Sequence, residues 1–217
     1  AAELLGQWKV DGMISGNLSS TADVVKSLLK NVWSMENISR ISSYFLMDTK
    51  LGLYIVADAA IQADPNSDQL AEIALLTSQS VIKYWIKPKI AMLSFSTDGS
   101  ASHQIVTKVQ EATEKARELL KKNDIEAIIE WELQLDAAII PEIAISKMPS
   151  SQLKWEANIL IFPDLNSGNI GYKLMQRFWW ATAIGPIIQW LNKPGNDLSR
   201  GCSVEDILDL YYITANS

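Results

Sequence analysis

The 217-residue sequence contains one cysteine, one histidine and only ten glycines. A lone cysteine, Cys202, excludes an intramolecular disulfide, and with His103 as the lone histidine a zinc site built from cysteines and histidines is excluded too. Neither residue has an evident catalytic partner in the sequence, so both are assigned to packing or to the surface. No run of eighteen apolar residues and no signal peptide are present. These absences predict a cytoplasmic protein without a bound metal ion, and the start at Ala1 instead of Met suggests a fragment.

Basic residues are outnumbered. Nineteen Lys and Arg stand against 25 Asp and Glu, which gives a net charge of −6. Because nucleic acids and anionic membranes attract basic surfaces, this balance argues against both as general partners. Hydrophobic residues make up 48% of the chain and charged residues 20%, which excludes a wholly disordered chain. The length allows one large domain or two small ones.

Apolar runs typical of strands alternate along the chain with segments typical of helices. We predict strands over residues 40–48, 53–57, 89–95, 127–130 and 156–162, the first two forming a hairpin. We predict helices over 22–31, 68–85, 101–122, 169–178, 183–191 and 204–215. Unbroken apolar strands between helices are typical of a parallel sheet covered on both faces. The expected fold class is therefore α/β with three layers.

Three polar loops adjoin predicted helices, and open α/β sheets bind ligands at the carboxyl ends of their strands. The first loop, 94–100, offers hydroxyls and backbone amides ahead of a helix, which suits an anion. The same residues are ordinary turn and capping residues, and taken alone this second interpretation is favoured. In the second loop, 162–169, Asp164 and two asparagines either orient a polar ligand or satisfy backbone amides, with the evidence about even.

The third loop, 192–206, leads into the last predicted helix. Ser199 and Arg200 come just before the helix N-terminus, where the positive dipole and the guanidinium together suit a phosphate. Asp206 lies three residues after Ser203, which is the spacing of a capping box. Spacing alone therefore favours a capping role for Asp206.

Four segments resemble one enzyme family in order and spacing. They are Leu93–Ala101 (LSFSTDGSA), Leu133–Pro141 (LQLDAAIIP), Ile161–Lys173 (IFPDLNSGNIGYK) and Asn196–Cys202 (NDLSRGC). Over nearly its whole length the sequence is similar to the phosphotransacetylases, also called phosphate acetyltransferases. The DLNSGN run favours this family over the phosphate butyryltransferases and over the related C-terminal domain of some malic enzymes.

The resemblance implies a two-domain, three-layer α/β/α fold like that of isocitrate and isopropylmalate dehydrogenases. The first domain of such a fold is split, so residues 1–35 and 191–217 would belong to it. Residues 36–190 would form the inserted second domain, with the active site in the cleft between the two. Family chains are longer, and the part absent here is the N-terminal part of the first domain. A homodimer is also expected.

The implied reaction is reversible acetyl transfer between acetyl-CoA and phosphate, which gives acetyl phosphate and CoA. Coenzyme A is then a substrate, and no cofactor is expected. By the resemblance, Asp206 is the base for the CoA thiol, Arg200 binds phosphate and Ser199 hydrogen-bonds the reacting groups. A thiol with a pKa of about 8.5 needs such a base at neutral pH, and a developing oxyanion needs fixed donors. The resemblance outweighs the capping role for Asp206, although both can hold.

The resemblance also assigns substrate-binding residues. They are Ser94, Ser96, Thr97, Gly99, Ser100, Lys26, Asp164, Asn166 and Asn169. Three positions depart from the family pattern. Lys26 stands for an arginine, which weakens bidentate phosphate binding, while Ser19 stands for a histidine and Asp98 for a lysine. Two alternatives stay open: a non-catalytic fragment, and a related acyltransferase of the phosphate butyryltransferase kind.

Tryptophan is abundant where glycine is scarce. The chain has eight tryptophans but only ten glycines in 217 residues, below the roughly 7% of average proteins. All eight fall where the family pattern has glycine: Trp8, Trp33, Trp85, Trp131, Trp155, Trp179, Trp180 and Trp190. We hypothesise that the gene uses UGA for glycine, as some bacterial lineages do, and that these codons were read as tryptophan. The chain as written should then be overpacked, with Trp179 and Trp180 adjacent on a helix and Trp190 close enough to the Ser199–Arg200 loop to displace it.

Overall fold

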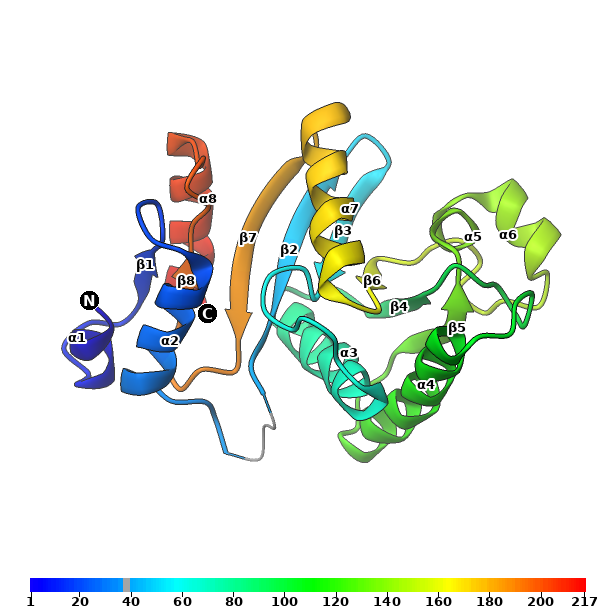
Figure 1. Ribbon diagram of the computed structural model, residues 1–217, viewed down its shortest axis with the longest axis horizontal. Coiled ribbons are helices and arrows are strands. Elements are labelled where there is room, and N and C mark those ends of the chain that lie inside the picture. The colour runs from blue at the N-terminus through cyan, green and yellow to red at the C-terminus, as the bar shows by residue number, and fades with distance from the viewer. Residues whose placement is uncertain (37–39) are drawn as a thin grey trace.

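The computed structural model describes residues 1–36 and 40–217, and its described strands form two sheets (Figure 1). The strands are β1 (Met13–Ser15), β2 (Ser42–Thr49), β3 (Gly52–Ala57), β4 (Lys89–Leu93), β5 (Ile128–Leu133), β6 (Ile159–Ile161), β7 (Thr182–Gln189) and β8 (Gly195–Asp197). The helices are α1 (Ala2–Gly6), α2 (Thr21–Asn31), α3 (Ser67–Ile82), α4 (Gln104–Lys122), α5 (Leu135–Ile139), α6 (Pro141–Lys147), α7 (Leu165–Phe178) and α8 (Val204–Ala215).

The larger sheet is mixed, with the strand order β5-β4-β6-β3-β2-β7. The pairs β4–β5, β4–β6 and β3–β6 are parallel. The β2–β3 hairpin was predicted and is antiparallel, and β7 also pairs antiparallel with β2. The expectation of a parallel sheet therefore holds for one half of this sheet and is wrong for the other half.

The helix predicted over 183–191 is wrong, because these residues belong largely to β7. The run is short and apolar, and such runs do not separate a buried strand from a buried helix. Pro186 inside the run disfavours a helix interior. The deciding partner is β2, whose pairing with β7 brings Ser42 opposite Gln189 and Asp48 opposite Thr182. That partner lies more than a hundred residues away in the sequence.

Helices lie against both faces of the larger sheet. Ile55 and Ala57 of β3 pack with residues of α3 and α4, such as Leu70 and Val109. Val56, between them, points the other way and packs in the cluster that contains Ala137 of α5 and Met175 of α7. This alternation along one strand gives each face an apolar surface for its helices.

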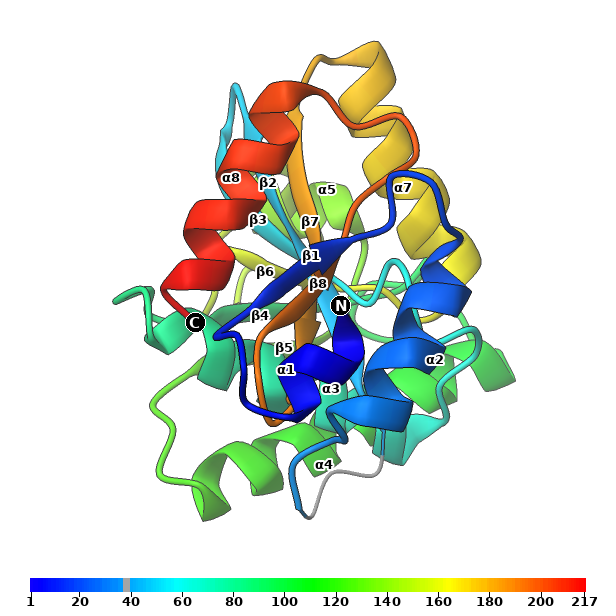
Figure 2. The same ribbon diagram turned by 90° about the vertical axis from the view of Figure 1, so that its left-hand side faces the viewer.

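The two ends of the chain meet in the smaller sheet, where β1 pairs in parallel with β8. Figure 2 shows β1 and β8 crossing in front of the larger sheet, with α8 on one side and α2 on the other. Leu5 of α1 and Leu28 of α2 are buried together with Leu191. Residues 37–39, near the start of the segment expected to form the second domain, lie outside the described residues. Within the described ranges, no helix has both the length and the apolar character needed to cross a membrane.

The tryptophans do not overpack the core as expected. Trp8, Trp33, Trp85, Trp179 and Trp180 are exposed, and the other three are half-buried. The placement of Trp179 and Trp180 on a helix is also wrong, because α7 ends at Phe178.

Candidate active site

A cleft of about 250 Å³ lies between the smaller sheet and α7. The loop from β8 to α8 forms one wall with the residues just before and at the start of α2, and α7 forms the opposite wall. Its lining includes Ser19, Thr21, Asn169, Tyr172, Lys173, Gln176, Arg177, Asp197, Ser199, Arg200, Cys202 and Asp206. Segments from both ends of the chain and from its middle therefore meet here.

The β8–α8 loop is held in place by backbone contacts at both ends. The N–H of Leu198 donates to the carbonyl of Ser15 at the end of β1 (2.7 Å). The N–H of Cys202 donates to the carbonyl of Ser199 (3.1 Å), which closes a turn. Ser199 and Arg200 are exposed in this turn and line the cleft. The loop thus presents a hydroxyl and a guanidinium just before the N-terminus of α8.

Asp206 both caps α8 and lines the cleft. Its Oδ2 accepts from the N–H of Ser203 (2.8 Å), and its own N–H donates to Ser203 Oγ (3.1 Å). The predicted capping box is therefore confirmed. A carboxylate has two oxygens and about four acceptor sites, so the cap leaves Asp206 with free acceptor sites.

One face of α7 supplies the predicted Asn169 and two cleft residues that the sequence analysis missed, Lys173 and Arg177. Asn169, Lys173 and Arg177 are spaced by four residues, so they lie one above another on the helix, and all three line the cleft. This spacing was readable in the sequence. Tyr172 stacks on Phe45 of β2, with 4.2 Å between the ring centroids. This stacking holds the helix face against the larger sheet.

The backbone of α7 is anchored close to the β3 end. Asn169 Nδ2 donates to the carbonyl of Ala59 (3.0 Å). Gly168 approaches so closely that a Cβ there would lie 2.5 Å from the carbonyl oxygen of Asp58, which requires glycine at this position. The carboxylate of Asp58 accepts N–H bonds from residues 60–62 and orders the loop that follows β3. Burial nevertheless raises the pKa of Asp58, against the lowering effect of these bonds.

Asp197 is a buried carboxylate in the cleft wall. Its Oδ2 accepts from Thr21 Oγ1 (2.5 Å), while Oδ1 has no hydrogen-bond partner within the described part of the chain. Burial raises the pKa of Asp197, although the bond from Thr21 and the N–H of Leu198 lower it. A Cβ at Gly16 would lie 2.0 Å from Oδ1, so the end of β1 fits around this carboxylate. No local sequence signal marks Asp197, because strand pairing buries it.

The structure does not bring the 94–100 loop to the cleft. Ser96 and Thr97 are buried, and Ser96 Oγ donates to Glu132 Oε1 (2.9 Å). The N–H of Gly99 donates to the same oxygen (2.6 Å). Ser100 Oγ in turn accepts from the N–H of Thr97 (3.0 Å). Ser94, the remaining predicted residue of this loop, also lies outside the cleft lining. A substrate-binding role for these residues stays a prediction.

Three further predicted residues lie outside the cleft. Lys26 is exposed on α2 and does not line it. Asp164 is the N-cap of α7 and accepts from the N–H of Ser167 (2.9 Å). Asn166 lies in the first turn of that helix. Asn169 is therefore the residue of the second loop that the fold brings together with Ser199, Arg200 and Asp206.

The lone cysteine and the lone histidine take different places. Cys202 lines the cleft and also packs against the core cluster that contains Leu210. His103 is exposed and caps α4, where its Nδ1 accepts from the N–H of Ile105 (3.2 Å). Of the two places left open for His103, core packing or the surface, the structure shows the surface.

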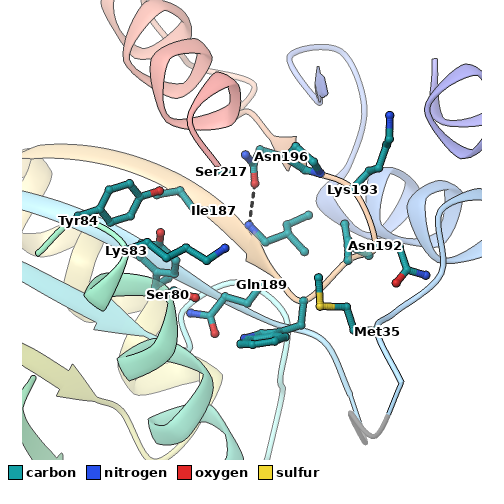
Figure 3. A pocket seen from close by; sticks show the side chains of 15 residues that line it. Met35, Ser80, Lys83, Tyr84, Ile187, Gln189, Asn192, Lys193, Asn196 and Ser217 are labelled. Atoms are coloured by element: carbon teal, nitrogen blue, oxygen red, sulfur yellow. Dashed lines mark hydrogen bonds between the residues drawn. The ribbon is translucent and has the colours of Figure 1, made fainter. Parts of the chain in front are cut away.

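A second cavity, of about 220 Å³, lies on the other side of β7 (Figure 3). Its lining offers Lys83 and Lys193 but no Asp or Glu among the described residues. Asn196 closes one side, where its Oδ1 accepts from the N–H of Ile188 (2.8 Å). Without a carboxylate beside its cations this cavity has no group suited to accept a proton from a thiol, so the cleft is the better candidate for chemistry.

The cleft combines three cations, Lys173, Arg177 and Arg200, with the carboxylate of Asp206 and the hydroxyl of Ser199. Cations bind an anion, and a carboxylate next to them can exchange a proton with a bound group. The fold and the site thus define an α/β protein with a cleft that brings cationic side chains, a carboxylate and a hydroxyl together.

Comparison with known proteins identifies the family. The chain belongs to the phosphate acetyl/butaryl transferase family, whose model matches residues 1–215. A phosphate acetyltransferase from Staphylococcus aureus is 46% identical over 207 residues, which cover 95% of this chain and 63% of that protein. A phosphotransacetylase structure from Streptococcus pyogenes superimposes with a TM-score of 0.90 at 49% identity, covering 99% of this chain and 65% of its own. A 4-hydroxythreonine-4-phosphate dehydrogenase from Klebsiella pneumoniae shares the fold alone, with a TM-score of 0.56 at 10% identity over 99% of this chain and 66% of its own. The chain spans less than two thirds of the length of the curated relative.

Proposed function

We propose that the protein containing this chain catalyses reversible acetyl transfer between acetyl-CoA and phosphate. The observation that carries the proposal is the joining of Ser199, Arg200 and Asp206 in one cleft. The family relationship adds the kind of reaction, because the similar proteins are phosphate acetyltransferases and phosphotransacetylases.

In the direction of acetyl-CoA synthesis, Asp206 takes the proton from the CoA thiol. The thiolate attacks the carbonyl carbon of acetyl phosphate, so that a carbon–sulfur bond forms while the carbon–oxygen bond to phosphate breaks. Phosphate leaves with the bonding electrons and is held by Arg200, whose planar fork suits its oxygens. The Ser199 hydroxyl donates to the oxyanion that develops on the carbonyl.

The second wall of the cleft suits the anionic parts of the substrates. Lys173 and Arg177 line the same cleft as the Ser199–Arg200 turn. We assign to them the phosphate groups that Arg200 does not hold. Ligand pockets usually measure about 300–1,000 Å³, so a cleft of about 250 Å³ fits the reacting ends of the substrates and not the whole of CoA.

The same proposal includes the domain division and the dehydrogenase-like, three-layer architecture. Residues 1–35 and 191–217 supply the small sheet, and the larger sheet comes from residues 36–190. The cleft is lined from both parts. Binding of CoA as substrate, the homodimer and a cytoplasmic location stay predictions of the resemblance.

The test is an assay of the protein from the full reading frame of the gene. Acetyl-CoA and phosphate should give acetyl phosphate and free CoA, and Arg200→Ala should abolish the reaction without unfolding the protein. Butyryl-CoA in parallel distinguishes an acyltransferase of the butyryl kind. A folded protein that turns over neither thioester would contradict the proposal.

A further inference from the structure

Six of the eight tryptophans have a backbone conformation that favours glycine. The φ angle is 61° at Trp8, 67° at Trp33, 58° at Trp85, 60° at Trp155, 52° at Trp180 and 64° at Trp190. Ten non-glycine residues in the described part of the chain have a positive φ, so tryptophan accounts for most of them. In this region the Cβ of an L-residue crowds the following carbonyl oxygen, and a bulky residue there is an outlier.

Four of the six follow the ends of helices. Trp8, Trp33, Trp85 and Trp180 come two or three residues after the last residues of α1, α2, α3 and α7. After α1, the N–H of Trp8 donates to the carbonyl of Leu5 (3.1 Å) and that of Lys9 to Leu4 (3.0 Å). After α3, the N–H of Trp85 donates to Ile82 (2.9 Å) and that of Ile86 to Val81 (3.3 Å). These paired bonds form the Schellman motif, whose left-handed residue is usually glycine.

The end of α4 provides a comparison within the same chain. Asp124 occupies the left-handed position there, with φ 53°. Its N–H donates to Lys121 (3.2 Å), and that of Ile125 donates to Leu120 (3.0 Å). Asp and Asn tolerate this conformation because their short polar side chains bond locally. The side chain of tryptophan is neither short nor able to form such a local bond. Conformational preference therefore does not explain why tryptophan recurs in this motif.

Trp155 lies in a turn with the same requirement. Lys154 and Trp155 both have positive φ, at 47° and 60°, and the N–H of Glu156 donates to the carbonyl of Leu153 (2.9 Å). This is a type I′ turn, in which Asn, Asp and Gly dominate the two central positions. Glycine at 155 would suit it.

The indole rings of these tryptophans have few contacts that could offset the strain of the backbone. The side chains of Trp85 and Trp180 are 95% and 82% exposed, so packing does not offset the backbone strain. Trp8 has one clear contact, with Lys193 Nζ 4.1 Å from its ring centroid. Trp190 donates a long bond from Nε1 to the carbonyl of Leu76 (3.5 Å).

We infer that these six positions are glycine in the protein that the cell makes, and that Trp131 and Trp179 share this origin. A single codon with two readings explains all eight positions at once, whereas independent substitutions would need a separate cause at each. The change raises glycine from 10 to 18 residues and leaves no tryptophan. None of the eight, all of which are described, lines the cleft, so the expected displacement of the site by Trp190 is not found and the inference is independent of the proposed function.

The direct test is the mass of peptides from the protein purified from its native host. Each peptide should be lighter, for every one of these positions that it covers, by the difference between an indolylmethyl group and a hydrogen atom, and UGA should stand at all eight codons of the gene. Peptides that cover residues 1–217 should together contain no tryptophan. Tryptophan in the native peptides at the six left-handed positions would overturn the inference.

A stability comparison tests the physical argument separately. Trp85→Gly should raise the melting temperature of the chain as written by about 2–4 °C, because it removes left-handed strain at an exposed site. Trp85→Ala removes the same indole but keeps a Cβ, so it should give no such rise. Trp179→Gly is the matched control, because Trp179 is exposed but has φ −116°. Equal effects of Gly and Ala at position 85 would overturn the argument from strain.

Discussion

Two hydroxyl-rich loops, 94–100 after β4 and 198–203 after β8, each lead from a strand toward a helix, but their polar groups point to different partners. In the first, Ser96 and Gly99 donate to the buried carboxylate of Glu132. In the second, Ser199 and Arg200 are exposed and line a cleft. Similar residue types therefore serve internal structure in one loop and an open site in the other.

The difference lies in a residue that neither loop contains. Glu132 is 36 positions from Ser96, and its burial makes it a strong acceptor for the donors of the first loop. Ser199 Oγ accepts from the N–H of Gly201 (3.3 Å), and among the residues that the structure describes neither Ser199 nor Arg200 donates to a buried carboxylate. A loop sequence gives the available donors, but only the packing around it determines whether they are already used.

The largest effect is expected at Asp206. Asp206→Asn should lower kcat by about 10²–10⁴-fold, because a general base contributes that much. The melting temperature should change little, since the amide oxygen of asparagine can also accept from the N–H of Ser203. Steady-state rates and thermal unfolding of the full-length protein measure both. Full turnover with a lower melting temperature would leave Asp206 with the capping role alone.

Arg200→Lys should have the next largest effect. The charge remains but the planar fork is lost, and hydrogen bonds to charged groups contribute about 1.5–3 kcal/mol. We expect the KM for phosphate and acetyl phosphate to rise by about tenfold or more, with a smaller change in the KM for CoA. An equal rise in all three would argue against a specific phosphate contact.

Glu132→Ala tests the other loop. It leaves the buried hydroxyl of Ser96, and the N–H of Gly99, without their acceptor, which costs about 1–3 kcal/mol of unfolding free energy. Denaturant unfolding should show this loss, while KM and kcat of the folded protein stay unchanged. The reverse result, a raised KM with unchanged stability, would assign the 94–100 loop to substrate binding, as the family resemblance implies.

Features fixed by contacts between residues close in the sequence could be predicted, and features fixed by contacts between distant residues could not. The capping box joins Ser203 to Asp206 three residues away, so its spacing was sufficient. The β2–β3 hairpin closes over a short turn and was predicted as well. The strand over 182–189 needed its distant partner β2, and was mistaken for a helix.

In the candidate site, too, prediction depended on how far apart the interacting residues are in the sequence. The Ser199–Arg200 loop was identified from its motif, and the α7 face with Lys173 and Arg177 was accessible from four-residue spacing but overlooked. Asp197 had no local signal, because its burial follows from the pairing of β8 with β1 and from Thr21. Pairings between the two ends of a chain leave no periodic pattern in either end.

Asp197 should make stability depend on pH in a defined direction. Burial raises its pKa in the folded protein, so the folded state binds this proton more readily than the unfolded state does. Stability contributed by this group should therefore increase as the pH falls from 7 toward about 4, near the unfolded pKa. Asp197→Asn cannot titrate there. The melting temperature of wild type relative to that of the variant should thus rise as the pH falls, and a constant or opposite trend would contradict the assignment.

The smallest effect is expected at Lys26, although the family resemblance places it among the phosphate ligands. Lys26 is exposed on α2 and lies outside the cleft lining. Surface charges away from a site change stability and binding little. Lys26→Ala should therefore leave the KM for phosphate within about twofold of wild type at moderate salt, and Lys30→Ala on the same helix is the matched control for net charge. If Lys26→Ala raised the KM well beyond the Lys30→Ala value, α2 would have to approach the cleft more closely in the complete protein than it does in this chain.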